Sequence, residues 1–218
     1  EEVDSIEEVQ SVLQTVGGAP MSIRAVRDDK TVQLTAQAVQ CGSDGQYKLG
    51  AWIRDSMAGI GTLTFCDPET GCFGALGHGI SDVDTAKLMP LQSGALLYSE
   101  VTDVQKGEKG APGELHGAFQ TQRELGQLSA NTAGGVFGTL TDESLLQGLE
   151  PVPVASRGEV RTGEATILSN IAGDRVEEYT VEIVHLYPAN DSDTRNLMLK
   201  VTDPRLLEAT GGIVQGMS

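Results

Sequence analysis

The spacing of apolar residues predicts a helix near the start of the chain, over residues 4–16. Apolar side chains recur there every three or four positions and so share one face of a helix. These positions are Ile6, Val9, Val12, Leu13 and Val16. Ser5 and Glu8 have the spacing of a capping box at the first turn, and Gly17 supplies a stop signal after the last one.

Beyond this helix the apolar pattern changes to a period of two, which is typical of β-strands. Two strands are predicted at 21–27 and 31–38. The turn-rich stretch 41–45 follows them and is the best candidate for a domain boundary. We therefore expect one domain over residues 1–40 and a second over 41–218.

The second domain is predicted to consist of short strands separated by glycine-rich turns, a pattern typical of an all-β sandwich or barrel. Little helix is expected in it, with one turn near 125–128 and another at 142–149. The strands are expected at 47–54, 61–65, 72–75, 95–103, 114–121, 135–139, 165–168, 177–186 and 196–201.

Composition and charge limit the classes of function. The chain has 218 residues, of which 39% are hydrophobic, so it can bury a core. Its net charge is −16 and no stretch concentrates Lys or Arg, which argues against a nucleic acid as partner. No run of apolar residues approaches the ~18 that a transmembrane helix needs.

The cysteines are Cys41, Cys66 and Cys72, and they lack the paired spacing of a structural zinc site. Cys66 and Cys72 flank a predicted hairpin turn, where a disulfide between them is one alternative and two free or buried thiols are the other. Asp82 and Asp84 supply too few oxygens for a calcium site. No metal or other cofactor is therefore predicted.

The strongest candidate for chemistry is His78, which lies between two glycines in the stretch 74–80. Small neighbours leave its imidazole accessible to a substrate, and histidine is the commonest general base near neutral pH. The alternative is a structural or merely exposed histidine. His116 and His185 fall in the middle of predicted strands and are interpreted as ordinary strand residues.

A second glycine-rich stretch, 211–218, ends in Gly216-Met217-Ser218. In chymotrypsin-like peptidases, a glycine two residues before the nucleophilic serine and the serine itself donate the N–H groups of the oxyanion hole. These residues would be Gly216 and Ser218. Without a partner histidine, a glycine-rich turn before a strand would be the simpler interpretation.

A third member of such a site is an acid that orients the histidine. Spacing alone does not choose among the candidates in this acidic chain. They are Asp82, Asp84, Asp103 and Asp203. Asp82 and Asp84 are equally well explained as part of a capped turn.

Longer motifs around these residues resemble those of the stage IV sporulation protein B family. They are residues 51–65, 73–82, 110–115 and 211–218. The resemblance implies a mainly β, chymotrypsin-like double β-barrel serine peptidase domain preceded by a PDZ domain. Residues 1–40 look like the C-terminal half of that PDZ domain. Family members continue past the equivalent of Ser218, so further strands are expected after it, and a chain without them is expected to be inactive.

The resemblance assigns the catalytic histidine to His78 and the nucleophile to Ser218, with the amides of Gly216 and Ser218 as the oxyanion hole. It assigns the acid of the triad to Asp203. An acid this close to the serine departs from the usual chymotrypsin-like order. The alternative is that Asp203 shapes the site and leaves a His–Ser dyad. The resemblance implies no metal and no cofactor.

The resemblance also implies protein or peptide substrates and a place in sporulation signalling. Family members are secreted from the forespore into the space between forespore and mother cell. There they cleave themselves and then a membrane-bound regulatory complex, which triggers intramembrane proteolysis and activates a late sigma factor. A membrane anchor is expected before residue 1. The alternative from another class is a non-catalytic, PDZ-containing scaffold that binds membrane-protein partners.

Overall fold

The computed structural model describes residues 2–27, 30–54, 56–188 and 195–217. Its contacts divide the chain into two compact units, Glu1–Ala58 and Gly59–Ser218. The domain boundary expected at 41–45 stays a prediction. Within the described ranges, no helix has the length and apolar character needed to cross a membrane.

The first unit contains the predicted helix, α1 (Ile6–Val16). Its N-cap is Ser5, whose hydroxyl accepts a hydrogen bond from the Glu8 N–H at 3.2 Å. The carboxylate of Glu8 accepts from the N–H of Asp4 (3.1 Å), so the reciprocal half of the capping box is displaced by one residue. The helix stops at Gly17, which has a positive φ of 62°.

Two antiparallel hairpins complete the first unit. They are formed by β1 (Pro20–Arg27) with β2 (Lys30–Gln37), and by β3 (Val39–Gln40) with β4 (Tyr47–Lys48). The first hairpin confirms the strands predicted at 21–27 and 31–38. The strand predicted at 47–54 is wrong beyond Lys48, because residues 49–54 pair with no strand in the described part of the chain.

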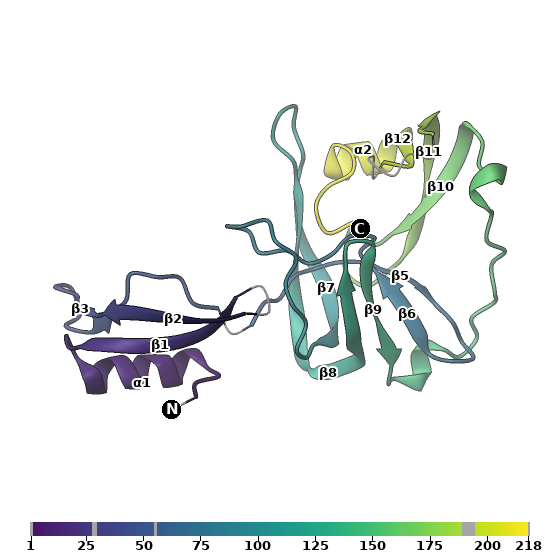
Figure 1. Ribbon diagram of the computed structural model, residues 1–218. Coiled ribbons are helices and arrows are strands. Elements are labelled where there is room, and N and C mark those ends of the chain that lie inside the picture. Colours follow the sequence, from purple (N-terminus) through teal and green to yellow (C-terminus); the bar gives the residue numbers. More distant parts are fainter. Residues whose placement is uncertain (1, 28–29, 55, 189–194, 218) are drawn as a thin grey trace. The chain divides into compact units, whose positions relative to one another are not determined.

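The second unit is built on a five-stranded antiparallel sheet with the order β5-β6-β9-β8-β7 (Figure 1). Its strands are β5 (Leu63–Cys66), β6 (Cys72–Ala75), β7 (Ala95–Gln105), β8 (Glu114–Thr132) and β9 (Gly135–Leu140). Phe73, Ala75 and Leu140 form a buried cluster on it. The sheet curls into a half-barrel, in agreement with the expected mainly β, chymotrypsin-like fold.

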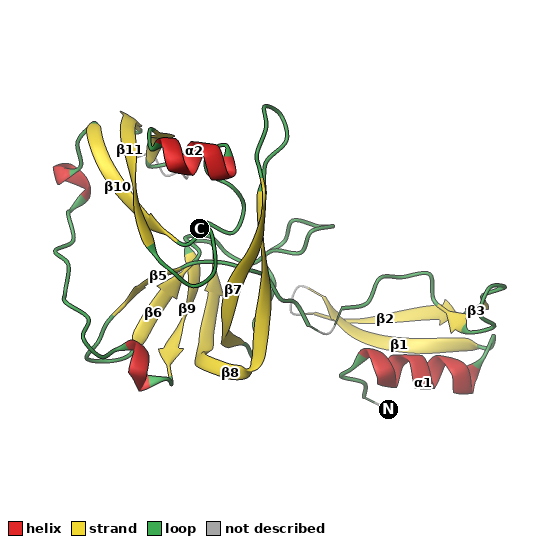
Figure 2. Cartoon of the chain, turned by 180° about the vertical axis from the view of Figure 1, so that it is seen from behind, coloured by secondary structure: helices red, strands yellow, loops and turns green. Residues whose placement is uncertain are grey.

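A second, three-stranded antiparallel sheet follows, with the order β10-β11-β12. Figure 2 labels its first two strands. Its strands are β10 (Gly163–Ser169), β11 (Glu177–Leu186) and β12 (Leu197–Val201). The helical elements of this unit are short: the 3-10 turns η1 (Glu143–Leu145) and η2 (Arg157–Glu159), and the helix α2 (Pro204–Thr210).

One of the two predicted helical turns is wrong. Residues 125–128 belong to β8, because Gly126 pairs with Leu96 on one side and with Leu140 on the other. The turn expected at 142–149 is confirmed, as the 3-10 turn η1. Conversely, α2 was not predicted from the apolar pattern, since seven residues are too few to show a helical period.

The hairpin between Cys66 and Cys72 is confirmed. The N–H of Asp67 donates to the carbonyl of Cys72, and the N–H of Gly71 donates to the carbonyl of Asp67, both at 2.8 Å. Both cysteines are free thiols. Of the two alternatives that the spacing left open, the structure has the free thiols.

Gly138 in β9 tests how closely this sheet is packed. A Cβ there would collide with the carbonyl oxygen of Gln127 and press on the ring of Phe73. We predict that Gly138→Ala lowers the free energy of unfolding by roughly 3 kcal/mol, the upper end for overpacking. Gly134→Ala is the control, because its Cβ would come only within 3.9 Å of Thr132. Equal urea midpoints for the two variants would contradict the prediction.

Candidate active site

His78 follows β6 on a stretch of strained backbone. Leu76 has a positive φ of 71°, which is rare for a residue with a branched side chain. The N–H of Gly77 donates back to the carbonyl of Ala75 at 3.0 Å, so the chain reverses across a single residue. Strain of this kind is often found at functional sites, where the surrounding structure holds it in place. The side chain of His78 is exposed, as the sequence predicts.

Asn131 of β8 holds the chain just after His78. Its side-chain oxygen accepts from the N–H of Ile80 (2.8 Å), and its amide nitrogen donates to the carbonyls of Ile80 (2.8 Å) and Met89 (2.9 Å). Gly79 fits between these segments only because it lacks a side chain, since a Cβ would collide with Leu88 and with the carbonyl of Thr132. Asn131 of β8 thus fixes the chain that directly follows His78.

The ring of His78 has one nitrogen directed at the backbone. Its Nδ1 lies 3.2 Å from the carbonyl oxygen of Gly79. A carbonyl can only accept a hydrogen bond, so Nδ1 is the donor, and Nε2 is then the nitrogen with a lone pair. In this tautomer, Nε2 can accept a proton, as a general base must.

The second glycine-rich stretch is docked on the first residues of β8. The N–H of Leu115 donates to the carbonyl of Gln215, and the N–H of Gln215 donates to the carbonyl of Gly113, both at 2.9 Å. Val214 packs with Val101 and Leu115 in a buried cluster. Gln215 therefore forms an isolated parallel bridge with Glu114 at the start of β8.

Gly216 occupies the one position of this stretch where glycine is required by a turn. The N–H of Met217 donates to the carbonyl of Val214 at 3.3 Å, and Gly216 has a φ of 91°, as in a type II turn. A trans peptide points its N–H opposite to its carbonyl. Because the Gln215 carbonyl faces Leu115, the Gly216 N–H faces away from β8, and it has no hydrogen-bond acceptor among the described residues.

Thr62 connects the two stretches. Its carbonyl accepts from the N–H of Leu76 at 3.1 Å, and its hydroxyl donates to the carbonyl of Gly216 at 3.4 Å. Leu76 and Gly216 thus contact the same threonine. Each stands two positions before a candidate catalytic residue, His78 or Ser218. Ser218 itself lies outside the described residues, so its placement as the nucleophile stays a prediction.

Asp203 is the N-cap of α2. Its carboxylate accepts from the backbone N–H groups of Arg205 (2.9 Å) and Leu206 (3.4 Å) and from the guanidinium of Arg205 (3.0 Å from Nη2). The guanidinium beside it, followed by these backbone donors, lowers the pKa of the carboxyl to about 2. His78 is not among these partners, and the assignment of Asp203 as the acid of a triad stays a prediction.

The structure also places other acidic and histidine residues that the sequence offered. Asp82 caps a turn by accepting from the N–H groups of Asp84 (3.2 Å) and Thr85 (2.9 Å), as one of the two interpretations predicted. Asp103 and His116 lie opposite each other on β7 and β8. In the described part of the chain, no group of three or more potential metal ligands occurs.

Sequence reasoning missed several residues that position this site. Thr62, Asn131 and Arg205 carry no motif, because an isolated polar residue next to a strand has many explanations. A signal for α2 was nevertheless present. Asp203-Pro204 followed by Gly211 is the common combination of an N-cap, a proline in the first turn and a glycine stop.

Comparison with known proteins identifies the family to which these residues belong. Residues 45–218 match the SpoIVB peptidase S55 family, a match that spans most of the chain and all of the residues just described. The chain belongs to this family. It is therefore a serine peptidase of sporulation, a hydrolase that acts on protein substrates. Searches of curated proteins and of solved structures found no match.

Asn131 gives a test of how the peptidase site is held together. Asn131→Ala leaves the N–H of Ile80 without its acceptor, which costs about 1–3 kcal/mol for a buried donor. We predict a lower urea midpoint together with a lower kcat, because the loop that carries His78 loses its anchor. Ser129→Ala, an exposed position in the same strand, is the control. Normal activity in the Asn131 variant would show that the loop is held by other contacts.

Proposed function

We propose that the chain cleaves peptide bonds with Ser218 as the nucleophile and His78 as the general base. The observation that carries this proposal is the double contact of Thr62, which joins the stretch before His78 to the stretch before Ser218. Two distant segments, each typical of half a serine peptidase site, share one anchoring residue. The family match supports the same chemistry.

The geometry supports a sequence of steps. His78 Nε2 removes the proton of the Ser218 hydroxyl while the serine oxygen attacks the scissile carbonyl. The N–H groups of Gly216 and Ser218 then stabilise the oxyanion, and the protonated imidazole gives its proton to the leaving amine. In the second half of the reaction, His78 removes a proton from water, which attacks the acyl-enzyme, and then returns the proton to the Ser218 oxygen as the acid product leaves.

The proposed substrates are the chain itself and a membrane-bound regulatory complex. Their cleavage would trigger intramembrane proteolysis and so activate a late sigma factor. The proposed location is extracytoplasmic, between forespore and mother cell, with attachment to the membrane through a segment before residue 1. Support for this pathway is the resemblance of the motifs around His78 and Ser218 to the family.

A fluorophosphonate probe tests the nucleophile and the base together. We predict that the purified full-length protein is labelled, that Ser218→Ala abolishes labelling and self-cleavage, and that His78→Ala lowers the labelling rate by several orders of magnitude. His116→Ala is the matched control for removal of a histidine and keeps the wild-type rate. Labelling of the Ser218→Ala variant at the wild-type rate would exclude Ser218 as the nucleophile.

Gly216 gives a second test, directed at the oxyanion hole. A Cβ there would need an unfavourable positive φ and would lie 3.2 Å from the Leu115 Cβ. We predict that Gly216→Ala lowers kcat by up to roughly 10²-fold, the usual cost of one oxyanion donor, with a much smaller change in KM.

The control for Gly216→Ala is Gly148→Ala. Gly148 has a similarly positive φ of 74° but no atom within 4 Å of its Cβ position. It therefore reports the backbone strain alone. Equal losses of kcat in the two variants would mean that Gly216 has no part in the chemistry.

A further inference from the structure

We infer that the connection between β7 and β8, residues 106–113, is a clamp that sets the position of the Gly216 N–H, and that Lys106 is a positioning residue of the oxyanion hole. This connection binds the chain before Gly216 at two places, the end of α2 and Gln215. The inference deepens the proposed function, because it rests on the roles proposed for Gly216 and Ser218.

The clamp is itself a closed loop that stands beside α2 (Figure 1). At its tip, the N–H of Glu108 donates to the carbonyl of Ala111 (2.9 Å), and the N–H of Ala111 donates back to the carbonyl of Glu108 (3.0 Å). This is the pattern of a two-residue hairpin turn. At its base, a Cβ on Gly113 would collide with the nitrogen of Gly107, so the two backbones touch. A loop closed at both tip and base can hold another segment in place.

The clamp first binds the end of α2. The last carbonyls of a helix have no donor within the helix and need one from outside. The carbonyl of Thr210 accepts from the N–H of Gly107 (2.8 Å), and the carbonyl of Glu208 accepts from the Nζ of Lys106 (2.9 Å). Lys106 therefore supplies a cationic donor at the C-terminal end of the helix, where a positive charge is favourable.

The chain that leaves α2 then passes directly against the clamp. Gly211 turns the chain with a φ of 76°, and a Cβ there would collide with the carbonyl of Gly107. Gly212 also has a positive φ, 143°, but no atom lies within 4 Å of its Cβ position. The close approach to the clamp is thus a property of Gly211 and not of the whole glycine-rich stretch.

The clamp binds the same chain a second time at Gln215. The carbonyl of Gly113 accepts from the N–H of Gln215 (2.9 Å), and a Cβ on Gly113 would collide with the side chain of Val214. Gly216 follows directly. Because one loop holds residues 208–215 at both ends, a shift of that loop would move the Gly216 amide with it.

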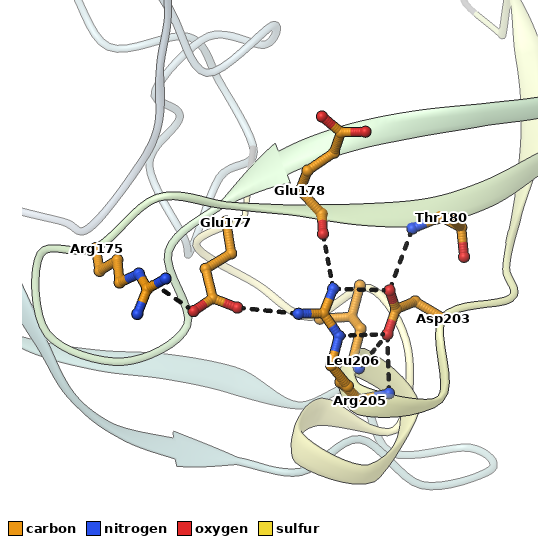
Figure 3. A network of polar contacts seen from close by, with 7 residues as sticks. All are labelled: Arg175, Glu177, Glu178, Thr180, Asp203, Arg205 and Leu206. Atoms are coloured by element: carbon orange, nitrogen blue, oxygen red, sulfur yellow. Dashed lines mark hydrogen bonds and ion pairs between the residues drawn. The ribbon is translucent and has the colours of Figure 1, made fainter.

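The first turn of α2 is held independently of the clamp. Figure 3 shows Asp203 and Arg205 in one network with β11. Arg205 donates through Nη2 to the carbonyl of Glu178 (2.8 Å) and pairs through Nη1 with the carboxylate of Glu177 (3.2 Å). Asp203 accepts from the N–H of Thr180 (3.4 Å). Weakening the clamp should therefore displace the chain after the helix and leave the helix itself in place.

Lys106→Met tests the clamp, because it keeps most of the side-chain stem and removes the donor. Lys106 is exposed, so the change should have little effect on stability. We expect kcat of the purified full-length protein on a peptide substrate to fall about tenfold, less than the 10²–10³-fold cost of removing an oxyanion donor. KM and the melting temperature should stay close to wild type.

Two further lysine variants frame this result. Lys106→Arg keeps a cationic donor and should restore most of kcat. Lys109→Met is the matched control, because Lys109 lies at the tip of the same connection and its side chain has no hydrogen bond or ion pair among the described residues. Its kcat should equal that of wild type.

A peptidyl trifluoromethyl ketone gives a readout that a merely structural role would not change. The Ser218 oxygen adds to the ketone carbon, His78 takes the serine proton, and the ketone oxygen becomes an oxyanion. Such an inhibitor resembles the transition state, whereas KM reflects the bound substrate more closely. If Lys106 positions the Gly216 N–H, the inhibition constant of Lys106→Met rises by the factor by which kcat falls.

A glycine pair tests the clamp without changing charge. Gly211→Ala and Gly212→Ala both place a Cβ on a residue with positive φ, but only the Cβ at Gly211 collides with the clamp. We expect Gly211→Ala to lower kcat at least tenfold more than Gly212→Ala. Equal kcat values for these two variants would contradict the inference.

The inference is overturned if Lys106→Met keeps the wild-type kcat and inhibition constant. It is also overturned if kcat falls while the inhibition constant stays unchanged, since the oxyanion hole would then be intact. Ser218→Ala separates these results from the proposed function. If that variant is inactive while Lys106→Met behaves as wild type, the nucleophile stands and the clamp is wrong. If Ser218→Ala keeps wild-type turnover, the proposed nucleophile is wrong, and the clamp has no oxyanion hole to position.

Discussion

The pairing of Gln215 with the start of β8 is the contact on which the peptidase site depends. It is made by two backbone hydrogen bonds, and the buried side chain of Val214 lies beside it. Because the backbone is held through the Gln215 carbonyl, the next N–H, that of Gly216, must face the opposite side. The pairing of Gln215 with β8 therefore positions the chain that leads to Ser218. It also exposes the N–H of Gly216, which is proposed to bind the oxyanion.

Glycines make this docking possible by allowing backbones to touch. A Cβ on Gly113 would collide with Val214 and with the N–H of Gly107, and one on Gly211 would collide with the Gly107 carbonyl. Two segments that are distant in sequence, 107–113 and 211–214, thus meet where glycines leave room for the contact. The same holds behind His78, where Gly79 passes between Leu88 and Thr132. At these positions glycine is explained by close approach of the backbone and not by flexibility.

Local patterns predicted most strands and singled out His78 and Ser218 as candidates, but they did not predict the contacts between distant segments. The strand expected at 177–186 coincides with β11, since its alternation and its flanking turns are local signals. Residues 125–128 contain only two large apolar residues, Leu125 and Leu128, too few to distinguish a helical turn from a strand. The roles of Thr62 and Asn131 depend on partners far away in the chain, which no local pattern contains. A resemblance could name His78 and Ser218, yet it could not show that Asp203 is enclosed by Arg205.

The Asp203 network combines an ion pair with backbone donors, and the two respond differently to solvent. The side chain of Arg205 is 60% exposed, and ion pairs with one exposed partner are weakened by solvent and by salt. The N–H groups of Leu206 and Thr180, in contrast, are fixed by the helix and the strand that carry them, and such charge-assisted bonds need no side chain to be ordered. Arg205 therefore contributes chiefly by joining Asp203 to β11. For the same reason, a neutral cap that keeps the acceptor oxygen should hold α2 nearly as well as the carboxylate does.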